Sequence, residues 1–174
     1  MEDSILTTGN ELPIIPEWVQ AKNESGGFHG ILFNYMRRYV KDMGTVMLVS
    51  EPPDVIPVLQ DYFPGITFGL YDPEIDLNIL QKPAKKKVDA VVAQALLEHI
   101  CRPCVAIETF CNMVKSGGYI ILHTHNIQMG YHAFPVDCCR FWKDYFVELC
   151  KYLPIKLKEY DEWREHITVC YYRV

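Results

Sequence analysis

Side chains that can move protons gather after one apolar stretch of the chain. His123 and His125 alternate at the end of the run GGYIILHTH, and His132, Asp137 and Arg140 follow it. Histidine titrates near neutral pH, so His132 can act as a general base toward a hydroxyl group. Asp137 can orient that base or bind substrate hydroxyls, and Arg140 can pair with Asp137 or with an anionic substrate. In an alternative, structural interpretation, Asp137 caps the next helix and Arg140 holds it in place.

The same histidines also permit a metal interpretation. Side chains at alternate positions of a strand point to one face, so His123 and His125 can act together, with His132 and Asp137 following them. We assign no metal site from the sequence and keep this set as an open alternative.

The elements that must position these side chains alternate along the chain. Apolar periodicity and turn residues predict helices at 28–43, 54–63, 102–114 and 136–153, and strands at 45–50, 66–72, 88–94, 117–125, 155–163 and 166–174. Asp54 is the expected N-cap of the second helix, which places Pro57 in its first turn.

This alternation predicts an α/β fold. Strands that are apolar throughout are typical of a doubly wound, mostly parallel sheet with helices on both faces. The short connection between the last two strands indicates an antiparallel C-terminal edge. We expect residues 1–44 to form an N-terminal arm and an amphipathic helix, and residues 45–174 to form the main domain.

Composition narrows the class of protein. The chain has 174 residues, of which 49% are hydrophobic, enough for one domain with its own core. A net charge of -5 argues against nonspecific binding to nucleic acid. The sequence has neither an 18-residue apolar run nor a signal peptide, so we expect a cytoplasmic protein that does not span a membrane.

The seven cysteines fit reduced thiols better than a disulfide framework. Cys101 and Cys104 form a C-x-x-C pair with Cys111 further along, which leaves a zinc site there as an alternative. Against it, the sequence has no second C-x-x-C pair.

Three sequence blocks carry a family resemblance. They are the apolar run with its corner, VDAVVAQALLEH, the turn KSGGY, and the segment GYHAFPVDCCRF at residues 130–141. In this order they resemble the class I S-adenosylmethionine-dependent methyltransferases, and among them the type 11 group. The resemblance extends from about Thr45 to the end of the chain and implies a Rossmann-like fold that binds S-adenosylmethionine.

The resemblance also implies where the cofactor would bind, and there the sequence departs from the family. The first strand should end in an acidic residue and a glycine-rich loop, but Leu48 takes the acidic position, and Ser50 and Pro52 take the glycine positions. Proline supplies no N–H, and added Cβ atoms narrow the space for a ligand. We expect Ser50 and Glu51 to contact the cofactor in a weakened or reshaped site, with complete loss of binding as the alternative.

The remaining cofactor candidates follow the second and third strands. Asp72 can accept hydrogen bonds from a ribose diol, although a turn aspartate before Pro73 explains it nearly as well. The resemblance places Asp76 near the adenine, in a short third-strand region. Three further candidates, near the sulfonium or at the start of the next helix, are Gln94, Ala95 and Glu98. For Glu98 a structural role at the helix start is favoured.

The sequence therefore predicts a methyltransferase, or a methyltransferase-like protein, that acts on a small-molecule or saccharide-like acceptor by in-line methyl transfer. The alternative is a noncatalytic pseudo-methyltransferase that serves as a binding or regulatory subunit. A protein partner or a homodimer fits either hypothesis.

Overall fold

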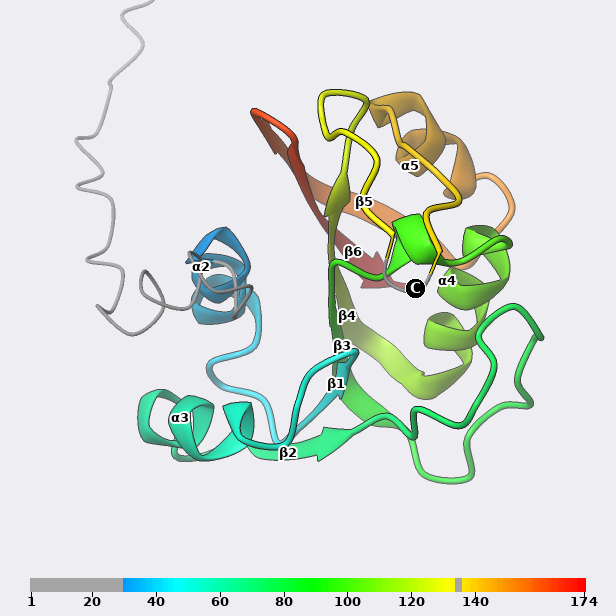
Figure 1. The fold of residues 1–174 in the computed structure, drawn as a ribbon. Coiled ribbons are helices and arrows are strands. Elements are labelled where there is room, and N and C mark those ends of the chain that lie inside the picture. Colours follow the sequence, from blue (N-terminus) through cyan, green and yellow to red (C-terminus); the bar gives the residue numbers. More distant parts are fainter. Residues whose placement is uncertain (1–29, 134–135) are drawn as a thin grey trace, which may run out of the picture.

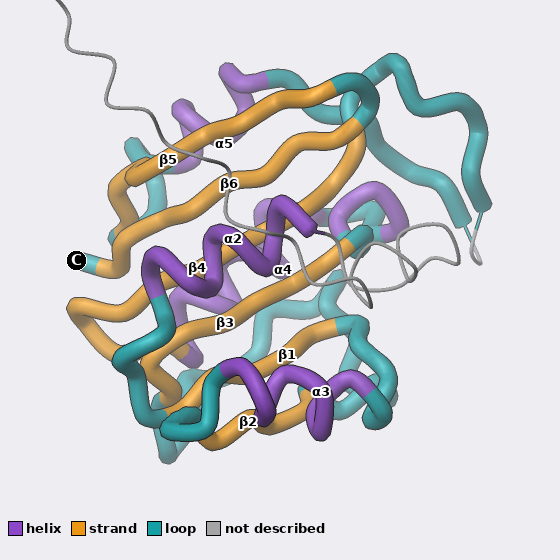
Figure 2. Tube along the Cα trace, turned by 90° about the vertical axis from the view of Figure 1, so that its left-hand side faces the viewer, coloured by secondary structure: helices purple, strands orange, loops and turns teal. Residues whose placement is uncertain are grey.

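A single six-stranded sheet organises the protein. The computed structural model describes residues 30–133 and 136–174, so the expectations for the arm before residue 30 lie outside the described residues. The strands lie in the order β2-β1-β3-β4-β6-β5 (Figure 2). Their bounds are β1 Thr45–Val49, β2 Thr67–Leu70, β3 Val88–Gln94, β4 Val114–His125, β5 Ile155–Trp163 and β6 His166–Arg173.

Strand direction follows the length of the connections. β2, β1, β3 and β4 pair in parallel, because helices or long segments join them. β6 runs antiparallel to β4, and β5 runs antiparallel to β6 across a tight turn in which Arg164 has φ 52°. The predicted mostly parallel sheet with an antiparallel C-terminal edge is confirmed.

Helices cover both faces of the sheet, as predicted. α2 (Gly30–Tyr39) and α3 (Val55–Tyr62) lie on one face, and α4 (Pro103–Met113) and α5 (Lys143–Leu149) lie on the other (Figure 1). None of the helices within the described ranges has the length and apolarity needed to cross a bilayer.

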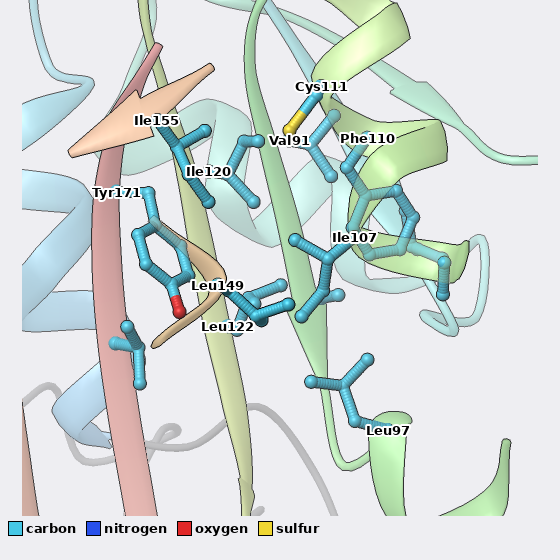
Figure 3. Packing of buried hydrophobic residues seen from close by; sticks show 14 of the residues in the cluster. Val91, Leu97, Ile107, Phe110, Cys111, Ile120, Leu122, Leu149, Ile155 and Tyr171 are labelled. Atoms are coloured by element: carbon cyan, nitrogen blue, oxygen red, sulfur yellow. The ribbon is translucent and has the colours of Figure 1, made fainter. Parts of the chain in front are cut away.

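Each face of the sheet has its own core. On the α4 and α5 face, side chains from β3, β4 and β6 interdigitate with those of the helices (Figure 3). Phe110 of α4 is fully buried there, and the Tyr171 hydroxyl donates to the Phe146 carbonyl at 2.9 Å. On the other face, α2 contributes Leu32 and Met36 to a second buried cluster. Burial on both sides explains why the strands read as continuous apolar runs.

α2 is also fastened to the C-terminal hairpin by polar contacts. The Tyr35 hydroxyl donates to Asp161 Oδ2 at 2.8 Å, and both Arg38 and Tyr39 contact the Glu159 carboxylate. A helix near one end of the described chain is therefore bound to strands near the other end.

Several predicted bounds differ in the structure: α2 ends at Tyr39 instead of residue 43, and β4 begins at Val114 instead of residue 117. The helix expected at 136–153 begins only at Lys143, because the backbone N–H groups of Cys138 and Cys139 donate to the Glu98 carbonyl, at 2.7 and 3.1 Å. Residues 136–142 are therefore an irregular segment that is bound to Glu98, after β3, and to His125, at the end of β4. The short third strand expected around Asp76 is absent, since residues 71–87 form an irregular crossover from β2 to β3.

The turn KSGG lies within β4 and brings two backbones close together. Gly117 has φ 87°, which favours glycine. A Cβ on Gly118 would lie 2.2 Å from the Asp89 carbonyl oxygen of β3, and here the pairing register between β3 and β4 shifts. Glycine is therefore required at position 117 by the backbone conformation and at position 118 by backbone packing.

Gly118→Ala should lower the free energy of unfolding by about 1–3 kcal/mol, because the new methyl group must displace the β3 backbone. Urea denaturation measures the loss. Gly130→Ala is the matched control, since nothing lies within 4 Å of the added Cβ. Equal stability of the two variants would contradict this account.

Candidate functional site

A pocket of about 680 Å³ opens at the carboxyl ends of β1, β2 and β3. Its lining comes from residues 49–53, 70–73 and 75–78 and from Leu96, His99 and Ile100. The volume is typical of sites for small organic ligands, and ligands of open α/β sheets bind at this edge. The lining includes Ser50, Glu51, Asp72 and Asp76, four of the residues that the sequence predicts to contact a cofactor.

The first loop keeps one backbone feature of a glycine loop without the glycine. Ser50 has φ 67°, in the left-handed region that glycine normally occupies. Pro52 and Pro53 follow, and their carbonyls accept the N–H groups of Val55 and Ile56 at 3.2 Å each, which starts α3. The loop therefore turns sharply under the pocket, but its prolines offer no N–H donors to a ligand.

The first turn of α3 forms without a hydrogen bond from the side chain of its N-cap residue. Asp54 occupies the N-cap position, as predicted, but its side chain makes no capping hydrogen bond. The two carbonyl contacts from the prolines already order the first turn. Pro57 lies in that first turn, as predicted.

Two aspartates line the pocket after β2, and both are exposed. Asp72 Oδ1 accepts the N–H of Glu74 at 3.0 Å, and Asp76 Oδ1 accepts the N–H of Asn78 at 2.8 Å. The turn role weighed for Asp72 is therefore present. Such a turn uses one carboxylate oxygen and is compatible with a second acceptor role toward a ligand.

Tyr71 adds a buried polar atom to the pocket lining. Its hydroxyl has no hydrogen-bond partner among the described residues, and burial, followed by the nearby charge of Asp72, raises the pKa of Tyr71. A neutral phenol of this kind can donate to an oxygen or nitrogen atom of a ligand. The sequence carried no signal for this residue beyond its place after a strand.

The three candidates after β3 are not brought to the pocket. Gln94 pairs with His123 in the sheet, and the N–H of Ala95, at φ 44°, donates to the His123 carbonyl at 2.9 Å. Glu98 is fully buried behind them. Leu96, His99 and Ile100 line the pocket in their place.

Glu98 is the centre of a buried polar cluster. Its Oε1 lies 2.6 Å from His125 Nδ1, and its Oε2 accepts the Thr124 hydroxyl at 2.6 Å. Burial alone would raise the pKa of Glu98, but hydrogen bonds from His125 and Thr124 lower it. Glu98 is in a short 3₁₀ helix, η1 (Leu97–His99), so the structural role favoured for it agrees with its burial.

The other histidines surround this cluster. His132 makes edge-to-face ring contacts with His125, at 5.6 Å between centroids, and with His99, at 5.0 Å. His99 Nδ1 lies 2.5 Å from the Val136 carbonyl, so Nδ1 carries the proton and Nε2 can accept one. Sequence reasoning missed His99 as a functional candidate, although it follows the LLE corner directly and lines the pocket.

His166 joins the cluster from β6. Its Nδ1 lies 3.1 Å from His123 Nε2, and burial, then the neighbouring His125, lowers the pKa of His166. The ring of Trp163 stacks on it at an interplanar angle of 12°.

Asp137 and Arg140 hold the loop that carries His132. Asp137 Oδ2 accepts the backbone N–H of His132 at 2.7 Å and a guanidinium N–H of Arg140 at 2.6 Å. Arg140 also donates to the Met129 and Gly130 carbonyls. The predicted pairing of the two is confirmed, whereas helix capping by Asp137 is wrong because α5 begins at Lys143. Asp137 orients His132 through its backbone.

The Asp137 contacts predict a stability loss in acid. A hydrogen bond from Arg140 is the main cause that lowers the pKa of Asp137 to about 2, against about 3.9 in an unfolded chain. The stabilisation is thus complete above about pH 4 and is lost as pH falls toward 2. Urea midpoints of wild type and Asp137→Asn should converge over this interval, and a constant difference would contradict the assignment.

The cysteines do not form the zinc site that was left open. No group of three potential ligands within residues 30–133 and 136–174 includes a cysteine. Cys111 is buried, and the Cys101 sulfur instead lies 3.0 Å from that of Cys138.

Taken together, these elements form a Rossmann-like fold with a pocket across its first three strands and a buried histidine cluster beside it. No model of a known protein family matches the chain, and no curated protein matches it.

Several solved structures that are similar to this chain are methyltransferases. The O-methyltransferase NcsB1 from neocarzinostatin biosynthesis, solved with S-adenosylmethionine and 2-hydroxy-5-methyl naphthoic acid, has a TM-score of 0.65 at 10% identity, over 90% of this chain and 56% of NcsB1. A SAM dependent methyltransferase from Archaeoglobus fulgidus has a TM-score of 0.63 at 12% identity, over 89% and 99% of the two chains.

A third similar structure comes from a protein complex. It is a complex of the Haloferax volcanii Trm112 methyltransferase activator and a putative methyltransferase, with a TM-score of 0.57 at 12% identity over 89% and 93% of the two chains. These likenesses show that the chain has the Rossmann-like fold of S-adenosylmethionine-dependent methyltransferases.

Proposed function

We propose that this protein is an S-adenosylmethionine-dependent methyltransferase that acts on a hydroxyl group of a small-molecule or saccharide-like acceptor. The observation that carries the proposal is the pocket at the carboxyl ends of β1, β2 and β3, which reaches His99 and through it the ring of His132. The shared fold with methyltransferases supports the same assignment.

The residues of the pocket fit this cofactor. Its volume of about 680 Å³ is sufficient, the left-handed turn at Ser50 is of the kind that passes under a ligand, and the buried Tyr71 hydroxyl can donate to it. Asp72 would hold the ribose hydroxyls and Asp76 would lie near the adenine. When bound, S-adenosylmethionine supplies a methyl group that is already activated on a positively charged sulfur.

The chain then needs to align the acceptor and remove one proton. His132 is the base that takes the proton of the acceptor hydroxyl, and Asp137 and Arg140 hold its loop in place. Methyl transfer is an in-line displacement, so positioning supplies most of the catalysis. The free thiols of the described cysteines fit a reducing compartment, and we propose a cytoplasmic location on that basis.

Calorimetry tests cofactor binding. Addition of S-adenosylmethionine or S-adenosylhomocysteine should release heat, and Asp72→Ala should weaken the affinity, since it removes the acceptor at the end of β2. Asp54→Ala is the matched control because this aspartate is exposed and absent from the pocket lining. An absence of heat at millimolar ligand would refute the enzyme assignment.

A noncatalytic subunit is the second candidate function. The observation that favours it is the pair Pro52 and Pro53, which leaves the first loop without two of its N–H donors. The Haloferax methyltransferase was solved with a protein partner, so a partner is compatible with this fold. If the cofactor binds but S-adenosylhomocysteine never accumulates with any of a panel of hydroxylated small molecules, this second function is preferred.

A further inference from the structure

Three histidines converge from two neighbouring strands on one face of the sheet. His123 and His125 alternate along β4, so they share a face, and His166 begins β6 directly opposite His125 in the pairing register. One imidazole nitrogen from each of the three lies within 4.8 Å of the other two. The methyl-transfer chemistry proposed above uses none of them.

The spacing suits a single small cation. A tetrahedral zinc ion binds imidazole nitrogens at about 2.0–2.1 Å, which places the ligand atoms about 3.4 Å from one another. His123 Nε2 and His166 Nδ1 are 3.1 Å apart. The distance between these two nitrogens is thus already close to the distance between two ligand atoms of a tetrahedral zinc ion.

Glu98 orients the third histidine, His125. Its carboxylate contacts His125 Nδ1 at 2.6 Å, so Nδ1 carries the proton and Nε2 is left to accept a metal. The Thr124 hydroxyl fixes the other carboxylate oxygen at 2.6 Å. A carboxylate that holds the far nitrogen of a ligating histidine is the usual outer contact of zinc sites.

We propose that His123, His125 and His166 bind one divalent transition metal ion, with zinc as the best fit, and that Glu98 positions His125 for it. Nitrogen ligands select zinc-like ions over magnesium and calcium, which prefer oxygen. Three protein ligands leave a fourth position for water or an oxygen atom of a ligand. The side chain of His166, 19% exposed, provides the path from solvent.

A second set of three groups, Glu98, His125 and His132, is also close enough to hold an ion. It is less suitable, because both oxygens of Glu98 already contact protein groups at 2.6 Å. The two sets share His125, so variants must be chosen among the residues that they do not share.

Metal analysis of untagged full-length protein tests the site. After treatment with a chelator, equilibrium dialysis against zinc should restore one equivalent, and the double variant His123→Gln/His166→Asn should lose it. His132→Gln is the matched control and should keep full stoichiometry. Glu98→Gln should weaken zinc affinity by about 10–100-fold, as a positioning residue would. Loss of zinc in His132→Gln with retention in the double variant would overturn the assignment.

A measurement on wild type makes the test independent of variant folding. Cobalt substituted for zinc should give the visible absorption of a tetrahedral ion without a sulfur-to-cobalt charge-transfer band, and X-ray absorption should show imidazole scattering. Sulfur ligands would place the ion at the cysteines, and failure of wild type to bind one equivalent would also overturn the proposal. S-adenosylmethionine binding is measured separately, so failure of either proposal is recognised independently.

Discussion

His132→Ala is expected to lower methyl-transfer turnover by about 10²–10⁴-fold, the usual contribution of a positioned general base. Affinity for S-adenosylmethionine should remain nearly unchanged, because His132 is not among the residues that line the pocket. Its ring instead contacts His99, which does line it. Single-turnover rates and calorimetry on the same preparations separate the two effects.

A conservative variant sharpens this test. His132→Gln keeps a polar side chain of similar length but cannot take up a proton, so it should lose as much turnover as the alanine variant. An unaltered rate in both variants would remove His132 from the mechanism. If His99→Gln alone abolished turnover, the base would be His99, whose Nδ1 contact with Val136 leaves Nε2 as an acceptor.

Glu98→Ala should produce the largest loss of stability, about 3–5 kcal/mol in the free energy of unfolding. The side chain is fully buried, and its removal leaves His125 and Thr124 without their partner. Glu98→Gln should cost less, since the amide oxygen can still accept one of these hydrogen bonds. Urea denaturation near neutral pH provides the values.

Glu148→Ala is the matched control for this prediction. Glu148 is an exposed glutamate in α5 that pairs with Lys151 at 2.7 Å, and exposed ion pairs contribute about 0–1 kcal/mol. A loss of stability in Glu98→Ala no larger than that of Glu148→Ala would show that the buried cluster contributes little to folding.

Most of the fold could be predicted because its signals are local. The strand expected at 88–94 has those bounds in the structure, since an apolar run between polar turns specifies its own ends. α5 was predicted too long. The Glu98 carbonyl accepts the N–H groups of Cys138 and Cys139, and hydrophobic periodicity carries no information on a contact between residues so far apart in the sequence.

The candidate site also contains residues that could be placed from the sequence and residues that could not. Asp72 could be predicted to lie at the pocket because it follows a strand, and the carboxyl ends of parallel strands share an edge. His166 could not be placed beside His123, since their contact depends on the pairing register of β4 and β6. The missing glycine at position 50 suggested a changed loop, yet the surrounding chain holds Ser50 at a positive φ.

The hydrogen bond between Tyr35 and Asp161 joins residues that are 126 positions apart. At translation speeds of about 5–20 residues per second, Asp161 is made roughly 6–25 s after Tyr35. On the ribosome, α2 must therefore remain without its polar contacts to the hairpin, and the apolar cluster that it shares with Cys170 of β6 stays incomplete, until the last strands emerge. Nascent chains stalled before β5 should accordingly be bound by chaperones that recognise exposed apolar segments, and chains released after β6 should not.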